Sequence, residues 1–176
     1  MPPGAIRKGV MARLHTIRNL DVANTYWGPA VSLFFNYCPW HCKGCWNEET
    51  WKLDEQLEIP NDEVVERVIA ALDAGGIKKD ISLLGGDPLA DLNRPDVEYI
   101  LEKVLAARPD TRVLCWTGYT WRRCKDFEVM KYIDVLIDGL YVQKLRILGK
   151  KYGSSNQKII DVKQSLATGQ PVILED

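Results

Sequence analysis

Three closely spaced cysteines are the residues of this sequence best suited to chemistry. Cys38, Cys42 and Cys45 occupy one short segment, with Gly44 easing a tight turn. Thiolates bind zinc and iron–sulfur clusters. A cubane held by three cysteines leaves one iron open to an exogenous ligand, whereas electron-transfer clusters commonly have four protein ligands. The spacing therefore predicts an iron–sulfur cluster with an open iron.

A structural zinc site is the alternative for these thiols. Such a site usually has a fourth close ligand, and the remaining cysteines, Cys115 and Cys124, are not arranged to provide it. His41 could complete a zinc site. Disulfides are not expected, because the cysteines are odd in number and no export signal precedes them. We expect Cys115 and Cys124 to be packing or surface thiols.

Alternating strand and helix patterns surround the cysteine segment. Strands are predicted at 31–37, 81–84, 113–116, 135–137 and 158–162, and helices at 61–72, 97–105 and, more weakly, 121–131. Asn61 is the expected N-cap of the first helix, and Gly75-Gly76 its stop. Helices between strands imply right-handed crossovers and a mainly parallel sheet. Residues 140–157 are expected to be rich in loops.

Polar motifs follow the predicted strands directly. They are Cys38, Gly85-Gly86-Asp87-Pro88, Thr117-Gly118-Tyr119 and Asp138-Gly139. In parallel α/β folds this edge forms the active site, so the motifs should converge. Alternatives remain: the second motif also suits a plain turn, the third a turn with a core-facing tyrosine, and Asp138 a cap of the next segment. Five tryptophans near this edge suit either core packing or protein docking: Trp40, Trp46, Trp51, Trp116 and Trp121.

The composition is that of an ordinary globular protein. The chain has 176 residues, of which 46% are hydrophobic and 27% charged, and its net charge is −1. We expect one domain over 1–176, with 1–12 as a flexible N-terminal extension. The charge balance gives no reason to expect binding to nucleic acid or to a membrane surface. No apolar run suits a signal peptide or membrane span, so a cytoplasmic location is expected.

Taken together, the motifs resemble the radical S-adenosylmethionine superfamily. The resemblance rests on three cysteines after a strand and a Gly-Gly-acidic-Pro turn after a later one. Within the superfamily the chain is similar to activating enzymes of anaerobic ribonucleotide reductase. The strings that carry this similarity are CPWHCKGCWN (38–47), LGGDPL (84–89), WTGYT (116–120), DVLIDG (134–139) and GSSNQ (153–157).

This resemblance implies a partial, incomplete TIM-like barrel and an oxidoreductase activity. Cys38, Cys42 and Cys45 would hold a 4Fe-4S cluster, and S-adenosylmethionine would bind its open iron. The residues implied in binding that cofactor are Gly85, Gly86, Asp87, Pro88, Thr117, Gly118, Trp46 and Asp138. Reductive cleavage would give a 5'-deoxyadenosyl radical that installs a glycyl radical on the reductase.

The implied partners are the glycyl-radical subunit of the reductase and a flavodoxin- or ferredoxin-like electron donor. Three alternatives stay open. The chain could act on a small molecule, as carboxy-deazaguanine synthases do, or activate a different glycyl-radical enzyme. Outside enzymes, it could be a zinc-binding structural module, which would be colourless where a cluster protein is brown.

Overall fold

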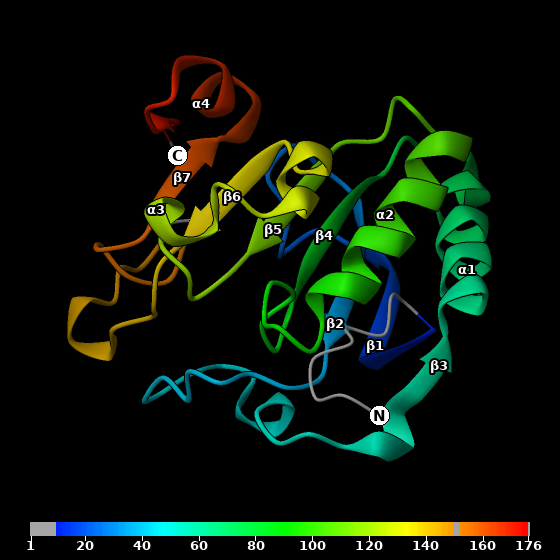
Figure 1. Ribbon diagram of the computed structural model, residues 1–176, viewed down its shortest axis with the longest axis horizontal. Helices are drawn as coiled ribbons and strands as arrows, with labels where there is room; N and C mark the ends of the chain where they lie inside the picture. The colour runs from blue at the N-terminus through cyan, green and yellow to red at the C-terminus, as the bar shows by residue number, and fades with distance from the viewer. Residues whose placement is uncertain (1–9, 150–151, 176) are drawn as a thin grey trace, which may run out of the picture.

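One mixed sheet organises the protein in the computed structural model, which describes residues 10–149 and 152–175 (Figure 1). The strand order is β3-β1-β2-β4-β5-β6-β7-β8. The strands are β1 (Met11–Asp21), β2 (Ala30–Phe35), β3 (Glu58–Pro60), β4 (Asp80–Gly85), β5 (Val113–Trp116), β6 (Val135–Asp138), β7 (Lys158–Asp161) and β8 (Val172–Ile173). The α/β class predicted from the sequence is confirmed.

The centre of the sheet is parallel. β2 pairs with β4, β4 with β5 and β5 with β6, all in the same direction. The first two connections after β2 and β4 carry the helices α1 (Asn61–Asp73) and α2 (Arg94–Ala107). These strands are buried along nearly their whole length, as expected for a sheet covered on both faces.

The outer strands are antiparallel, so the expectation of a mainly parallel sheet is wrong. β1 pairs antiparallel with β2 and β3, and β7 pairs antiparallel with β6 and β8. No long crossover helix joins β1 to β2 or β6 to β7 in the described chain, and parallel pairing needs such a crossover. Among the described strands, β3 and β8 form the two free edges and the sheet is not closed. The partial barrel stays a prediction.

Two helix predictions need correction. Asn61 is not the N-cap of α1; Pro60 occupies that position, and the buried Asn61 side chain donates to Asp96 of α2 at 2.9 Å. The helix predicted at 121–131 is not continuous: α3 covers only Trp121–Cys124, and a separate 3₁₀ turn covers Glu128–Tyr132. The stop at Gly75-Gly76 is confirmed, with Gly75 in a left-handed conformation (φ 80°).

Side chains alternate between the two faces of the sheet. In β5, Val113 and Cys115 join the large core under α1 and α2, whereas Leu114 packs on the opposite face with Trp116 at its border. Cys115 and Cys124 are both buried in the large core. They are therefore packing thiols, one of the two alternatives expected.

The first strand was missed by sequence patterns. Met11 and Ala12 already belong to β1 and pair with Pro60 and Ile59. The extension expected over 1–12 therefore does not include these two residues, and residues 1–9 lie outside the described residues. Within the described ranges, none of the helices combines the length and apolar character needed to cross a membrane.

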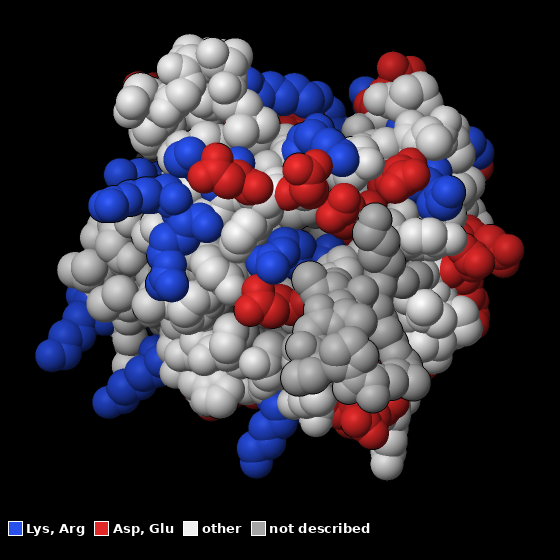
Figure 2. Space-filling model, in the orientation of Figure 1, with Lys and Arg blue, Asp and Glu red and all other residues white. Residues whose placement is uncertain are grey.

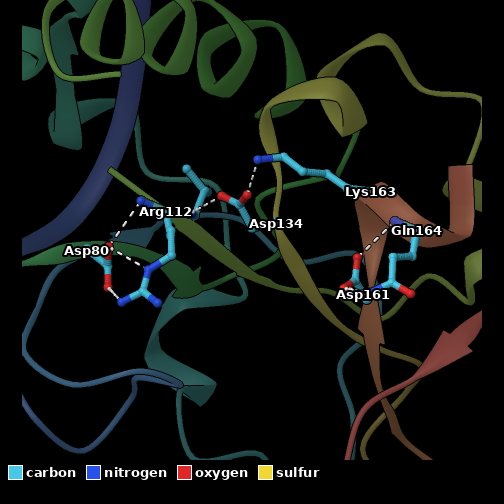
Figure 3. A network of polar contacts seen from close by, with 7 residues as sticks. Asp80, Arg112, Asp134, Asp161, Lys163 and Gln164 are labelled. Carbon is cyan, nitrogen blue, oxygen red and sulfur yellow. Dashed lines mark hydrogen bonds and ion pairs between the residues drawn. The ribbon is translucent and has the colours of Figure 1, made fainter. Parts of the chain in front are cut away.

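Ion pairs secure the amino ends of the central strands (Figure 3). Asp80, which begins β4, accepts from the Arg112 side chain at 2.6 Å and from its backbone N–H at 3.0 Å. Asp134, just before β6, accepts from the Val113 backbone at 2.8 Å and pairs with Lys163 of α4 (Val162–Thr168). This network holds three neighbouring connections together at the edge away from the cysteines.

Candidate functional site

The cysteine loop leaves β2 at the carboxyl edge of the parallel strands, where the loops after β4 and β6 also emerge (Figure 1). Backbone hydrogen bonds close its base, from Tyr37 to Thr50 (2.7 Å) and from Cys38 to Trp51 (3.2 Å). The buried Asn36 side chain adds a bond to the Lys52 carbonyl at 3.0 Å. The segment 38–49 therefore projects from a fixed base.

All three cysteines on this loop are free and partly exposed. Cys45 donates its backbone N–H to the Cys42 carbonyl at 3.0 Å, with Gly44 in a left-handed turn (φ 73°) between them. Burial raises the pKa of Cys38 to about 12, and repulsion from Asp87 and Cys42 adds to the increase. Burial also raises the pKa of Cys42, with a further contribution from Cys45. Cys42 therefore lies near enough to both Cys38 and Cys45 for repulsion between the thiolates.

The donor set suits an iron–sulfur cluster. Three thiols that form no disulfide share one loop, and thiolates are the usual ligands of such clusters. Among the described residues, no group of three His, Cys, Asp or Glu side chains is arranged to hold a single metal ion. His41, the side chain that could have completed a zinc site, stacks on Trp51 with ring centroids 5.0 Å apart.

The Gly85-Gly86-Asp87-Pro88 turn packs directly against the base of the cysteine loop. Gly86 donates to the Phe35 carbonyl at 2.7 Å, and Asp87 donates to the Tyr37 carbonyl at 3.0 Å. A Cβ atom on Gly86 would overlap the Tyr37 carbonyl, and one on Gly85 would lie 2.8 Å from the Phe34 backbone. Both glycines are therefore required for close approach of two backbone segments.

Asp87 connects three segments through its buried carboxylate. It accepts hydrogen bonds from the Trp40 indole on the cysteine loop, from the Thr117 hydroxyl (2.8 Å) and from the Gly118 backbone (2.9 Å). The Leu89 backbone donates a further bond at 2.9 Å. Burial raises the pKa of Asp87, and these hydrogen bonds oppose the increase. Asp87 therefore fixes the position of the cysteine loop relative to β5.

Thr117 and Gly118 lie beside the cysteine loop, as their position after β5 predicts. A Cβ atom on Gly118 would overlap the Trp40 indole, so this glycine provides the space that Trp40 occupies. Tyr119 packs against the large core and meets Trp40 edge-on, with ring centroids 4.8 Å apart. The core-facing tyrosine was one of the two alternatives for this motif.

Neither Asp138 nor Trp46 is hydrogen-bonded to Asp87 in the described part of the chain, although Asp138 lines a cavity together with Trp40 and Gly118. The buried Asp138 carboxylate accepts from the backbone of Trp121 (2.7 Å) and Lys158 (3.2 Å), which are the contacts of the capping alternative. Trp46 is 74% exposed, and the Arg146 guanidinium lies over the Trp46 ring, 5.3 Å from the ring centroid.

Two cavities adjoin the cysteine loop and share no lining residue. One, of about 310 Å³, is lined by Cys45, Trp46 and Trp116 together with the loop 146–149. The buried Trp116 indole N–H has no hydrogen-bond partner among the described residues. The other, of about 780 Å³, is bordered by Trp40 and Gly118 and extends along α3 to Lys158.

The sequence pattern gave no sign of a role in the site for two asparagines, Asn36 and Asn93. Asn36 binds both the Lys52 carbonyl and the Asp54 backbone N–H, the latter at 2.8 Å. Asn93, before α2, donates to the carbonyls of Asn36 (3.0 Å), Tyr37 (3.2 Å) and Asp87 (2.8 Å). An asparagine next to a predicted helix suggests only a cap, so nothing in the pattern indicated a role in joining the two loops.

Comparison with known proteins agrees with this arrangement. Residues 27–160 match the family model described as a 4Fe-4S single cluster domain. A Vibrio cholerae protein is 36% identical, and the match covers 82% of this chain and 95% of the relative. An Enterobacteria phage T4 protein is 35% identical, with 75% of this chain and 83% of the relative covered. An Escherichia coli K12 protein is 32% identical, with 82% of this chain and 96% of the relative covered.

Each of these relatives carries the same name, anaerobic ribonucleoside-triphosphate reductase-activating protein. The similarity covers most of the chain and includes the cysteine loop and the strands that carry it. The protein therefore belongs to the family of anaerobic ribonucleoside-triphosphate reductase-activating proteins, with a 4Fe-4S single cluster domain.

Proposed function

We propose that this protein is a radical S-adenosylmethionine activating enzyme, an oxidoreductase that installs a glycyl radical on anaerobic ribonucleotide reductase. The observation that carries the proposal is the packing of the three-cysteine loop against the Gly86-Asp87 turn at the carboxyl edge of the parallel strands. The names of the relatives supply the reductase as partner. The proposal includes one domain, a partial-barrel sheet and a cytoplasmic location, where thiols stay reduced.

Cys38, Cys42 and Cys45 would hold the 4Fe-4S cluster as thiolates. When bound, this cluster supplies an open iron for S-adenosylmethionine and a low-potential electron for its sulfonium, which yields a 5'-deoxyadenosyl radical. The raised pKa of Cys38 and Cys42 means that these ligands lose protons when metal binds. The hydrogen-bonded base of the loop limits the geometries that the three thiolates can adopt.

The residues around the loop suit S-adenosylmethionine in two ways. The turn 85–88 and the segment Thr117-Gly118 are held beside the cysteine loop by hydrogen bonds of their N–H groups, and backbone carbonyls there would accept from the ammonium group of the ligand. The cavity beside Cys45 has a mainly apolar lining that includes Leu84 and Trp116, which would surround the apolar part of the ligand. Trp46 lines the same cavity.

The same cavity gives a route for the protein substrate. Its outer wall is the loop 146–149, and exposed apolar side chains border it, including Trp46 (74% exposed) and Leu148 (80%). Exposed apolar residues around a site are typical of protein contacts. A glycine-bearing segment of the reductase would enter here and bring its Cα hydrogen to the radical.

Anaerobic reconstitution tests this proposal. The protein is loaded with iron and sulfide, reduced with dithionite and given S-adenosylmethionine, and 5'-deoxyadenosine is quantified. We expect product from the wild type and none from Cys42→Ala, whereas Cys124→Ala, which changes a buried packing thiol, keeps the activity. Wild-type protein with a verified cluster and no product would contradict the proposal.

The partner is tested separately. Wild-type protein that cleaves S-adenosylmethionine is mixed with the anaerobic reductase, and the glycyl radical is measured by electron paramagnetic resonance. A radical signal that requires Cys42 supports the activase function. Cleavage without any radical on the reductase would favour a different substrate, either a small molecule or another glycyl-radical enzyme.

A further inference from the structure

The cavity of about 780 Å³ beside α3 has a basic border. Its cationic lining residues are Arg122, Arg123, Lys125 and Lys158, and its one acidic lining residue is Asp138. Asp138 is buried and its carboxylate accepts backbone hydrogen bonds, so it offers little negative charge to a ligand at the surface. The border of this cavity is therefore positive, although the whole chain carries a net charge of −1.

Two of these cations are not neutralised by neighbours. Arg122 and Arg123 are exposed, and within the described part of the chain neither side chain makes a hydrogen bond or an ion pair. Lys125 pairs only with the adjacent, exposed Asp126 at 2.8 Å. Figure 2 shows Lys and Arg side chains gathered over the α3 side of the molecule, at the left of the view. Such unpaired charges attract an acidic partner over long range.

The basic cavity reaches the cysteine loop at one point. Trp40, which lies between Cys38 and Cys42 in the sequence, forms part of the cavity wall together with Gly118. Its indole is held there by the hydrogen bond to Asp87. The cavity that contains Cys45 and Trp46 is lined by different residues. A partner in the basic cavity would therefore contact the loop and the outer side of Gly118 without occupying the cavity beside Cys45.

We propose that this basic cavity docks a low-potential electron-carrier protein with an acidic surface. The inference rests on the proposed function, because a cluster that cleaves S-adenosylmethionine must receive an electron from outside the chain. The reduced flavin or iron–sulfur centre of the carrier loses one electron and the cluster held by Cys38, Cys42 and Cys45 gains it, with no bond made or broken. Arg122 and Arg123 steer the carrier, and the Trp40 side of the loop faces it.

Stopped-flow reduction of the reconstituted cluster measures this docking directly. The probe is flavodoxin in its fully reduced state, and bleaching of the cluster absorbance is followed at several salt concentrations. We expect the double variant Arg122→Glu/Arg123→Glu to be reduced about tenfold more slowly than wild type at low salt, with a weaker salt dependence. Reduction by dithionite should not change.

A matched control separates local charge from net charge. Lys78→Glu/Lys103→Glu changes the net charge by the same amount at exposed positions that do not line the cavity. We expect flavodoxin to reduce this control at a rate within about twofold of wild type. Equal slowing in both double variants would overturn the proposal, because the effect would then be one of overall charge.

Dithionite-driven reactions distinguish the remaining outcomes. With dithionite as reductant, Arg122→Glu/Arg123→Glu should cleave S-adenosylmethionine and form the glycyl radical on the reductase at the wild-type rate. Loss of the glycyl radical alone would overturn the proposal and assign the cavity to the reductase. Absence of 5'-deoxyadenosine from the wild type would instead contradict the proposed function, independently of the docking.

Discussion

At the scale of single residues, one buried carboxylate carries much of the organisation of the site. Asp87 is 2% exposed and accepts hydrogen bonds from the Trp40 indole, the Thr117 hydroxyl and the backbone of Gly118 and Leu89. All four of these donor groups are neutral. Burying a carboxylate is costly unless its hydrogen bonds are made. The network therefore fixes the positions of the donor groups as well as that of the carboxylate.

Asp87→Asn is expected to loosen the cysteine loop. The amide presents an NH₂ group to N–H donors, so at least one hydrogen bond is lost and a buried donor is left unpaired, at a cost of about 1–3 kcal/mol. We expect iron to be lost to a chelator about tenfold faster, which corresponds to about 1.4 kcal/mol. The loss is followed by the absorbance of the reconstituted cluster.

Two further variants control this prediction. Asp110→Asn makes the same chemical change at an exposed site and should lose iron at the wild-type rate. Trp40→Phe removes one donor, so Asp87→Asn combined with Trp40→Phe should cost less than the sum of the two single changes. Strict additivity would show that the Asp87–Trp40 hydrogen bond does not position the loop.

A second residue-scale prediction concerns pH. Burial raises the pKa of Cys124 to about 12, whereas the pKa of an unfolded thiol is about 8.5. Because the pKa is higher in the folded state, the neutral thiol makes its full contribution to the free energy of unfolding below about pH 8.5. This contribution is lost as the pH rises toward 12. The free energy of unfolding of cluster-free wild type should therefore decrease in this window by up to about 1.4 kcal/mol per pH unit more than that of Cys124→Ala.

Denaturant titrations at pH 7.5, 9 and 10 under reducing conditions check this difference. Other groups that titrate in this range are the same in both proteins and cancel in the comparison. Parallel pH curves for wild type and Cys124→Ala would show that the folded thiol ionises as easily as the unfolded one.

At the scale of elements, the site depends on how closely the ends of β2 and β4 approach. These strands pair in parallel through Phe35 and Gly85, and the turn after β4 bonds directly to the backbone after β2. Side chains at Gly85 or Gly86 would prevent this approach. The glycines of the motif therefore have a packing role in addition to their proposed role beside the ligand.

Gly86→Ala should push the turn after β4 away from the backbone after β2. Its Cβ would overlap the Tyr37 carbonyl, and relief requires backbone movement at the base of the cysteine loop. We expect a loss of about 1–3 kcal/mol in the free energy of unfolding, as for other overpacked sites, and less iron bound after reconstitution. Gly75→Ala is the control: its Cβ meets open space, so it should bind iron normally and lose only the cost of its positive φ. Normal iron content in Gly86→Ala would contradict this account.

At the scale of the whole molecule, the loops at the carboxyl ends of the central strands (the carboxyl edge) and those at the amino ends (the amino edge) have different roles. The carboxyl edge carries the cysteine loop and both cavities that adjoin it. The amino edge carries the network of Asp80 with Arg112 and of Asp134 with Lys163 (Figure 3). In α/β folds, chemistry gathers at the first edge and stability at the second.

Asp80→Asn tests this division. The variant loses the charge partner of Arg112 at a buried position, so the free energy of unfolding should decrease by about 1–3 kcal/mol, measured by denaturant titration. The rate of S-adenosylmethionine cleavage well below the unfolding midpoint should stay at the wild-type value. A lower rate in fully folded Asp80→Asn would show that the two edges are coupled.

Much of this molecule follows from local pattern. The central strands, both long helices and the cysteine loop were predicted within a few residues, because β-branched runs, helical spacing and glycine stops are properties of neighbouring residues. The convergence of Cys38, Asp87 and Thr117 also followed, since loops after parallel strands share one edge.

Other features depend on contacts between distant segments. The strand β1, the antiparallel direction of β7, the break in the 121–131 helix and the asparagines that join the loops leave no periodic signal. Asn93 illustrates the reason: its role exists only where three carbonyls from two separate segments meet. The sequence by itself determined the ligand types, their spacing and the strand that presents them. Only the tertiary structure decided which donors hold Asp87 and which cations border the cavity beside Trp40, because those contacts join residues far apart in the chain.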